Sequence, residues 1–362
     1  MKVKPAQLQR GCITTKDVEG LTDFPIIKEN TVLTDELIDI LKLFLVDMVE
    51  VESVLANGET FKPLEVIEEI EEIEIENNKE KQNEFLYQYV EAVKQFKKLF
   101  QSWQAGRKVE MLEVRTIFIP LFERVMEQPK KLLQLHHYSN KEDYNYHHSV
   151  YVGILSAYIG YKMKLNKGDW LQIGFGGVLA DLGMTKVSPS ILKKKGSLTS
   201  VEFEEVKKHP IHSYKMLKGI TGVSDLILLA VLQHHERYDG SGYPLGVNSK
   251  KIHLFSQIVA ISDVYHAMTT ERLYRSKRFP YQVLEDITKE QFGKFDVKVV
   301  QALLQSLVQI SIGDKVRLSS GDDAEIVFID QQIPTRPMVK LLNSEEIIEL
   351  NHHPSIFIEE II

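Results

Sequence analysis

Two adjacent histidines, His234 and His235, lie at the end of an apolar stretch that runs from Asp225 to Leu232. The spacing of the apolar residues predicts a helix, so the two imidazoles project from its last turn, about 100° apart around the axis. Both rings can serve one site only if that site is wide, as a cluster of two metal ions is. The alternative is a polar helix end that binds nothing.

Four further residues are candidate ligands because of their sequence surroundings. His209 precedes a proline at the end of a helical stretch, and His148 opens a long apolar helix. Asp181 and Asp263 follow or interrupt apolar stretches, and a buried carboxylate is costly unless it is paired or binds a metal. Taken singly, each is more often a capping or hydrogen-bonded residue than a ligand. Together with the paired histidines they supply four imidazoles and two carboxylates, a set that suits iron, manganese or zinc.

The elements that must position these side chains are helices. From Lys108 to about Leu307 apolar residues recur every three to four positions, and strand-like alternation is nearly absent. We therefore expect a mainly α fold in which a multi-helix domain at 108–310 holds every candidate ligand. The predicted helical stretches are 111–126, 148–164, 170–181, 200–218, 222–236, 254–270 and 280–307.

Smaller units are expected on both sides of the helical block. Residues 1–60 are predicted to form a small α/β unit with a helix that starts at Thr34, whose hydroxyl can cap the first turn. Residues 61–107 form an acidic, helical connector, and its tract 63–82 is typical of either a solvated helix or a partner-binding surface. Residues 311–362 alternate apolar and charged positions between turn signals, which predicts a small antiparallel β unit.

The composition limits the classes of function. The chain has 362 residues, 43% of them hydrophobic, and a formal net charge of −7, which argues against broad binding of nucleic-acid polymers. A single cysteine, Cys12, excludes an intrachain disulfide and an oxidising compartment. The N-terminus lacks the apolar core of a signal peptide, and the best candidate for a membrane span, 37–55, contains five charged residues. We expect a soluble, cytoplasmic protein with no membrane segment.

The order and spacing of these motifs resemble those of the HD-GYP proteins, a branch of the HD-domain metal-dependent phosphohydrolases. The resemblance covers about residues 108–308, and its long loop motif makes it specific, whereas the flanking units match far more weakly. The matching positions are His148, Ala180-Asp181-Leu182-Gly183, His209-Pro210, His234-His235-Glu236, Asp239-Gly240-Ser241-Gly242-Tyr243-Pro244 and Asp263.

The resemblance implies a centre of two or three divalent metals that hydrolyses the bacterial second messenger cyclic di-GMP. Iron or manganese is the expected metal, with zinc as an alternative. On this basis Asp181 bridges the two metals. The other implied metal ligands are His209, His234 and His235 for one metal and His148 and Asp263 for the other.

Further roles follow from the same resemblance. The implied catalytic residues are Asp181, His209, His234, His235 and Asp263, and the implied loop near the substrate contains Asp239, Gly240, Gly242, Tyr243 and Pro244. Arg272 and Arg275 match the phosphate-binding positions, and three residues apart on a helix they share a face. The alternative for this pair is two solvated arginines. Because they lie nine and twelve residues after Asp263, a kink or turn near Thr269 is required.

Four positions depart from the family pattern. Ala180 stands where the family has the histidine of its His-Asp motif, and a methyl group cannot bind a metal. Met184 replaces a phosphate-binding lysine, His266 replaces an aspartate, and Tyr144 replaces a carboxylate of three-metal members, which favours two metals at most. Three explanations for Ala180 remain open. Either the protein binds the nucleotide without hydrolysing it, or the change was engineered to trap ligand, or His266 or His147 completes the set of metal ligands.

Three functions are therefore compared. The first is a cyclic di-GMP phosphodiesterase impaired by Ala180. The second is a catalytically inactive signalling protein that binds the nucleotide, or a protein partner through the Tyr243 loop. The third is an HD-type enzyme that acts on another phosphoester. A homodimer is a further expectation, and metal content separates the first two functions, since two metals per chain favour the enzyme.

Overall fold

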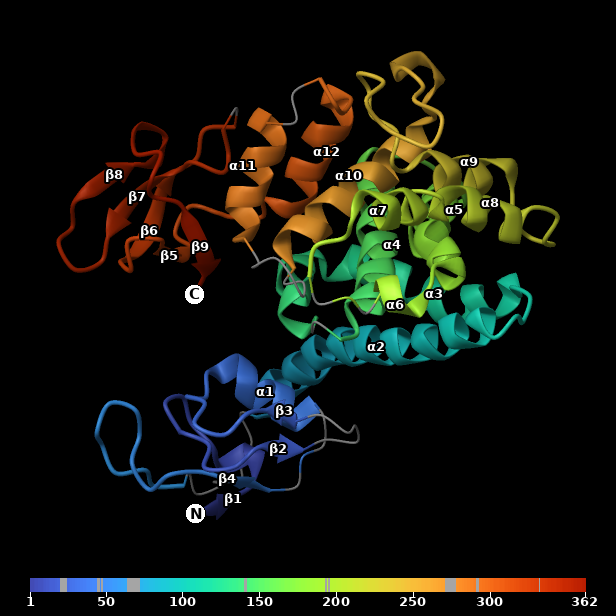
Figure 1. Ribbon diagram of the computed structural model, residues 1–362. Helices are drawn as coiled ribbons and strands as arrows, with labels where there is room; N and C mark the ends of the chain where they lie inside the picture. Colours follow the sequence, from blue (N-terminus) through green and yellow to red (C-terminus); the bar gives the residue numbers. More distant parts are fainter. Residues whose placement is uncertain are drawn as a thin grey trace. The chain divides into compact units, whose positions relative to one another are not determined.

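The computed structural model describes residues 1–19, 25–43, 46, 48–63, 72–139, 142–192, 194, 196–270, 278–290, 293–331 and 333–362. The chain divides into two compact units, Met1–Tyr87 and Gln88–Ile362. Their elements are labelled in Figure 1. Each unit is described by itself.

The N-terminal unit combines short strands with one helix. Strand β1 (Lys2–Val3) pairs antiparallel with β4 (Val49–Glu50), and β2 (Val18–Glu19) pairs antiparallel with β3 (Pro25–Ile27). A 3-10 turn, η1 (Pro5–Gln7), follows β1. Helix α1 (Asp35–Leu43) begins after Thr34, whose hydroxyl oxygen accepts a hydrogen bond from the Leu37 amide at 3.3 Å. This cap is the one that the sequence predicts. A core of buried apolar residues, with Cys12 among them, holds these elements together.

Helices dominate the second unit, so the predicted mainly α fold class is confirmed. Helix α2 (Glu72–Gln104) includes residues 72–82 of the acidic tract, and residues 64–71 of that tract lie outside the described part of the chain. The remaining helices are α3 (Met111–Glu127), α4 (Tyr144–Lys162), α5 (Lys167–Leu179), α6 (Pro189–Leu192), α7 (Ser200–Val206), α8 (His209–Leu217), α9 (Asp225–Gln233), α10 (Leu254–Thr269), α11 (Pro280–Glu290) and α12 (Val297–Leu307). The 3-10 segments are η2 (Pro129–Tyr138), η3 (Ala180–Lys186), η4 (Ser249–Lys251) and η5 (Leu350–His352).

Two predicted helical stretches are in fact pairs of helices. The stretch 200–218 breaks after Val206, and His209 is the first residue of α8 rather than the end of the preceding helix. Pro210 explains this break, since proline is tolerated in the first turn of a helix but not in its interior. The stretch 280–307 breaks before Asp296, whose carboxylate caps α12 by accepting a hydrogen bond from the Lys298 amide.

Small residues let α4 and α5 pack closely at the centre of the unit. A Cβ carbon added at Gly177 would lie 2.9 Å from the Cα of Gly153, and one added at Gly153 would lie 2.3 Å from a methyl of Val178. Such distances leave room for glycine only. The close packing brings the second turn of α4, with His148, near the end of α5, which leads into Asp181.

Among the described residues, no helix is long and apolar enough to cross a membrane.

The C-terminal part of the second unit is a five-stranded antiparallel sheet in the order β8-β7-β6-β5-β9, drawn in red beside α11 in Figure 1. Its strands are β5 (Lys315–Leu318), β6 (Asp323–Phe328), β7 (Met338–Leu341), β8 (Ile347–Glu349) and β9 (Ile358–Ile361). The apolar face of the sheet shares its core with Tyr281 of α11. A buried ion pair joins the same two parts, with Arg336 Nη2 2.6 Å from Glu285 Oε2 of α11. The predicted boundaries between domains stay a prediction.

Candidate metal centre

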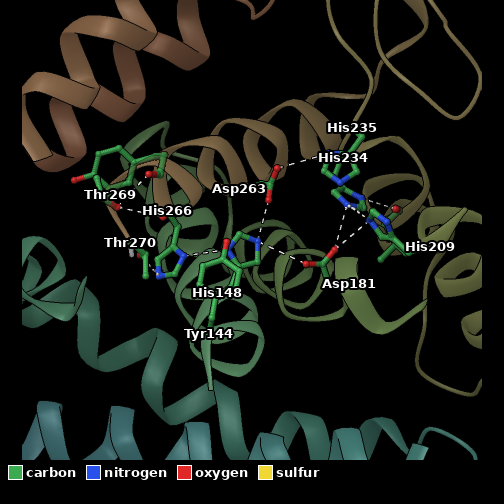
Figure 2. Close-up of polar contacts among 12 residues, drawn as sticks. Tyr144, His148, Asp181, His209, His234, His235, Asp263, His266, Thr269 and Thr270 are labelled. Atoms are coloured by element: carbon green, nitrogen blue, oxygen red, sulfur yellow. Dashed lines mark hydrogen bonds and ion pairs between the residues drawn. The ribbon is translucent and has the colours of Figure 1, made fainter. Parts of the chain in front are cut away.

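Four of the predicted ligands converge on one point of the helical unit. Asp181, His209, His234 and His235 each offer one ligand atom, and these atoms all lie within 4.8 Å of one another. Asp181 lies in η3, His209 lies in the first turn of α8, and His234 and His235 directly follow α9 (Figure 2). His209 and His234 are both 1% exposed. Residues that are far apart in the sequence thus form one cluster of three imidazoles and a carboxylate, in which Asp181 and His235 are half-buried.

Backbone carbonyls fix which nitrogen of His209 and of His234 carries the proton. His209 Nδ1 lies 2.8 Å from the carbonyl oxygen of Val206, and His234 Nδ1 lies 2.7 Å from that of Val231. A carbonyl only accepts, so each Nδ1 donates, and the lone pair of each neutral ring is on Nε2. The two Nε2 atoms face each other at 3.1 Å. Two lone pairs at this distance repel unless a cation lies between them, so this donor set fits a divalent metal.

Asp181 contributes its two oxygens to two different groups of ligands. Its Oδ1 lies 3.1 Å from His209 Nε2, while its Oδ2 lies 3.6 Å from His148 Nε2. Burial alone would raise the pKa of Asp181, but the side chains of His209 and His234 beside it hold the pKa well below its usual value. The carboxylate is therefore ionised, and it has the geometry of a bridge.

The second group consists of His148, Asp263 and the far oxygen of Asp181. His148 Nε2 lies 2.9 Å from Asp263 Oδ1. Burial would raise the pKa of Asp263, but the hydrogen bond to His148 and the nearby His235 keep it below its usual value. The group offers one imidazole and two carboxylate oxygens. Ala180, which is 4% exposed, lies one residue before Asp181 and contributes only a methyl group.

Residues 122–299 match the family model described as an HD domain. This segment of the chain is similar to HD domains. The recognition of an HD-GYP type of HD domain from the sequence is confirmed.

Three curated relatives are similar to this HD-domain chain. It is 31% identical over 223 residues to the cyclic di-GMP phosphodiesterase PA4108 of Pseudomonas aeruginosa, an alignment that covers 62% of this chain and 54% of the relative. It is 30% identical over 215 residues to the cyclic di-GMP phosphodiesterase PdeB of Borreliella burgdorferi, covering 59% and 56%. It is also 32% identical over 136 residues to the 3'3'-cGAMP-specific phosphodiesterase 3 of Vibrio cholerae, covering 38% and 29%. The chain thus spans about half the length of the first two relatives.

His235 lies between the two ligand groups of the HD domain. Its ring centroid is 4.1 Å from that of His234, and its Nδ1 is 3.7 Å from Asp263 Oδ2. Burial, followed by the nearby His234, lowers the pKa of His235 well below its usual value. A neutral imidazole with an available lone pair is the form that binds a metal.

The loop after the paired histidines folds back over the HD-domain centre. Glu236, which is 2% exposed, accepts hydrogen bonds from the Leu245 amide at 2.6 Å and from the Val247 amide at 3.0 Å. The Tyr243 ring lies 4.6 Å from the His235 ring. A Cβ carbon at Gly242 would lie 2.4 Å from the Arg237 nitrogen, so the fold requires glycine there. Of the predicted loop residues, Tyr243 thus lies beside the ring of His235, and Gly242 packs against the His235 backbone.

The loop turns sharply at Asp239 and Gly240. Asp239 Oδ1 accepts a hydrogen bond from the Ser241 amide at 2.9 Å, and Gly240 has a φ of +81°. The peptide bond between Tyr243 and Pro244 is cis.

Other predicted residues lie outside the cluster or outside the described residues. Arg272 and Arg275 fall in the segment 271–277, which the structure does not describe. Helix α10 does end at Thr269, where the sequence requires a turn. Neither histidine proposed to replace Ala180 points at Asp181. His147 Nδ1 lies 3.1 Å from the Tyr89 hydroxyl, and His266 Nδ1 lies 3.0 Å from His148 Nδ1, on the far side of that ring.

Several residues that shape the site carry no clear signal in the sequence. Glu236 was part of the loop motif, but its role as the anchor of the loop depends on two amides that lie nine and eleven residues later. Ser213 and Thr270 had no signal of their own, because a single hydroxyl on a helix is common. Met184 is half-buried in η3.

Proposed function

We propose that this protein is a metal-dependent phosphodiesterase that hydrolyses a cyclic dinucleotide, with cyclic di-GMP as the first candidate substrate. The observation that carries the proposal is the convergence of Asp181, His209, His234 and His235 within 4.8 Å. The names of the relatives support the substrate class, since two are cyclic di-GMP phosphodiesterases and one is specific for 3'3'-cGAMP.

The donor set suits iron or manganese, with zinc as an alternative. His209, His234, His235 and Asp181 would hold one metal, and His148, Asp263 and Asp181 would hold the other. A divalent metal in such a site polarises a phosphoryl oxygen and lowers the pKa of water.

The protein's own groups prepare this chemistry. Both carboxylates are ionised, because their pKa values lie below the usual range. The carbonyls of Val206 and Val231 keep the rings of His209 and His234 oriented with Nε2 inward. The Tyr243 ring packs 4.6 Å from the His235 ring, a position from which it would limit the access of water on that side. Hydrolysis then adds water across one P–O ester bond of the ring and gives a linear dinucleotide.

Phosphate recognition is assigned to Arg272 and Arg275, which follow α10 by a few residues. Guanidinium groups form two parallel hydrogen bonds to phosphate oxygens. Met184 cannot supply the cation that a lysine would supply at its position, so these arginines carry a larger share of substrate binding.

A second function is favoured by one specific observation, the methyl group of Ala180. The group made of His148, Asp263 and Asp181 has a single imidazole, so it binds a metal more weakly than the three-histidine group. A protein that holds one metal and binds the cyclic dinucleotide without cleaving it is the alternative that follows.

The test is turnover by the purified protein after loading with iron or manganese. Cyclic di-GMP, 3'3'-cGAMP and a simple phosphodiester are supplied in parallel, and the products are separated by chromatography. We expect linear dinucleotide from one of the cyclic substrates. Absence of hydrolysis both by this chain and by Ala180→His overturns the enzymatic proposal, and binding of the intact nucleotide in calorimetry then supports the alternative.

A further inference from the structure

A row of buried polar groups lies behind His148, on the side away from the carboxylates. His148 Nδ1 lies 3.0 Å from His266 Nδ1, and His266 Nε2 lies 3.2 Å from Thr270 Oγ1 (Figure 2). The Tyr144 hydroxyl also lies 3.1 Å from His148 Nδ1. Tyr144 and His148 are four residues apart on α4, and His266 and Thr270 are four apart at the end of α10, so each pair shares a helix face.

The proton positions in this row follow from what His148 must do at its other nitrogen. Its Nε2 faces Asp263 at 2.9 Å and Asp181 at 3.6 Å. A metal ligand offers a lone pair, so a neutral His148 that binds through Nε2 carries its proton on Nδ1. That proton needs an acceptor, and His266 Nδ1 lies 3.0 Å away, slightly closer than the Tyr144 hydroxyl at 3.1 Å.

The same reasoning continues through His266. If its Nδ1 accepts, its proton is on Nε2, and this N–H donates to the hydroxyl oxygen of Thr270. Without a metal the row can run in the reverse direction, with His148 Nε2 donating to Asp263 and His266 Nδ1 donating to His148. Both rings remain neutral in either direction, so the two arrangements differ only in tautomer.

Because His266 is buried, water cannot easily take its place as the hydrogen-bond partner of His148. Its side chain is 0% exposed, and Thr270 is 2% exposed. The Tyr151 ring packs 4.5 Å from the His266 ring, and the Tyr144 ring lies 6.1 Å away. A hydrogen-bond partner that is lost in such a place leaves an unsatisfied N–H, which is costly.

We propose that His266 is a positioning residue that holds His148 in the tautomer with its proton on Nδ1, and that Thr270 fixes His266 in turn. This inference rests on the proposed metal centre, and it assigns a use to a histidine at a position where the resembling family has aspartate. His266 supports the group of His148, Asp263 and Asp181, which is the group weakened by Ala180. Metal ligands are commonly oriented in this way by the hydrogen bond of their second nitrogen.

The direct test is nitrogen NMR of the full chain with labelled histidines, with and without zinc, which is diamagnetic. The signals of His148 are assigned through His148→Gln. At saturating zinc we expect His148 of the native protein to carry its proton on Nδ1. In His266→Leu we expect this tautomer of His148 to be no longer the main form. In His266→Asn, whose amide oxygen lies near the place of Nδ1, we expect it to be the main form again.

Zinc calorimetry supplies an independent readout. We expect His266→Leu to weaken the second zinc equivalent by roughly 10- to 100-fold and to leave the first equivalent unchanged, which also shows that the variant is folded. Tyr144→Phe, which removes the competing hydroxyl, should leave the tautomer as in the native protein.

Two results overturn the proposal. One is a native His148 that carries its proton on Nε2 at saturating zinc, and the other is a His266→Leu variant with the native tautomer. Failure of the proposed function is recognised separately, since a protein with the expected tautomers that hydrolyses no cyclic dinucleotide refutes the activity and leaves the role of His266 intact.

Discussion

Gly183 lies directly against the backbone of His209, because a Cβ carbon added at residue 183 would stand 2.1 Å from the His209 carbonyl oxygen. Ser213 strengthens this contact. Its hydroxyl oxygen accepts a hydrogen bond from the Gly183 amide at 2.6 Å, and the hydroxyl donates to the Ala180 carbonyl at 2.7 Å. The segment that carries Asp181 and the helix that opens with His209 are therefore held in a fixed register.

This contact predicts that Gly183→Ala weakens metal binding although residue 183 is no ligand. The added methyl must push η3 away from α8, and with it Asp181 away from His209. We expect a loss of roughly 1–3 kcal/mol in the free energy of unfolding, typical of overpacking, and a lower zinc affinity in calorimetry. Gly196→Ala is the matched control, since a Cβ there meets nothing within 4 Å. Equal zinc affinities in the two variants would contradict the prediction.

Ala180→His should raise the metal content of the purified protein. The new imidazole adds a donor beside Asp181, so the group of His148, Asp263 and Asp181 gains a second nitrogen ligand. We expect the metal affinity of this group to rise by at least roughly 10- to 100-fold, which is the usual contribution of residues that hydrogen-bond to metal ligands. Elemental analysis of iron and manganese per chain measures the change. An unchanged metal content would mean that Ala180 is not what limits this group.

Removal of a ligand from the three-histidine group should have the larger effect. His234→Ala deletes one of the two facing Nε2 atoms, and we expect the first metal equivalent to be lost in calorimetry at micromolar protein. His352→Ala, in the C-terminal part of the chain with a side chain 70% exposed, is the control for a histidine that faces solvent. Retention of both equivalents in His234→Ala would remove this residue from the proposed ligands.

The buried ion pair of Arg336 with Glu285 predicts that removing one partner lowers the free energy of unfolding more than removing both. Both side chains are 7% exposed, and Arg336 Nη1 also donates to the carbonyls of Leu350, His353 and Ile356. Among the described residues, Arg336→Leu leaves the buried Glu285 carboxylate with Lys289, 3.5 Å away, as its remaining ion-pair partner. We expect a cost of about 3–5 kcal/mol in denaturant unfolding. The double variant with Glu285→Leu should recover part of it, and a double variant as unstable as the single one would show that the charge is not the cause.

Cys12 should react slowly with thiol reagents in the native state. The thiol is buried in the N-terminal core, and burial raises its pKa, so the reactive thiolate is rare at neutral pH. Because it is the chain's one cysteine, the labelling rate reports on the N-terminal unit alone. We expect the rate to rise by orders of magnitude in guanidinium chloride. A native rate equal to the denatured rate would show that this core does not protect the thiol.

Much of the site was predictable from residue types and their order. His234 and His235 end an apolar helix as their pattern indicates, and the cost of burying Asp181 and Asp263 pointed to partners that the structure supplies. The sequence was less informative where one residue changes the course of the backbone. Pro210 lies in the first turn of α8 and does not follow a helix. His209 is therefore the first residue of α8 and not the end of the preceding helix.

Contacts between distant segments were beyond the sequence. The acceptor for His148 Nδ1 comes from His266, 118 positions later, and no periodic pattern encodes a hydrogen bond between two helices. The same holds for Glu236, whose partners depend on how tightly the following loop turns. The resemblance marked His266 as a departure from the family pattern, but only the packing of α4 against α10 shows which nitrogen it meets.

Because Asp181 gives one oxygen to each ligand group, two metal ions bound as proposed would share a single negative charge. A cation at one position would draw on that charge and repel a cation at the other, so the second ion would bind less tightly than it would alone. Loading would then be stepwise, with the three-histidine position filled first. When metal is scarce, most copies of the chain would carry a single ion, and the supply of metal in the surroundings would govern how many carry the pair.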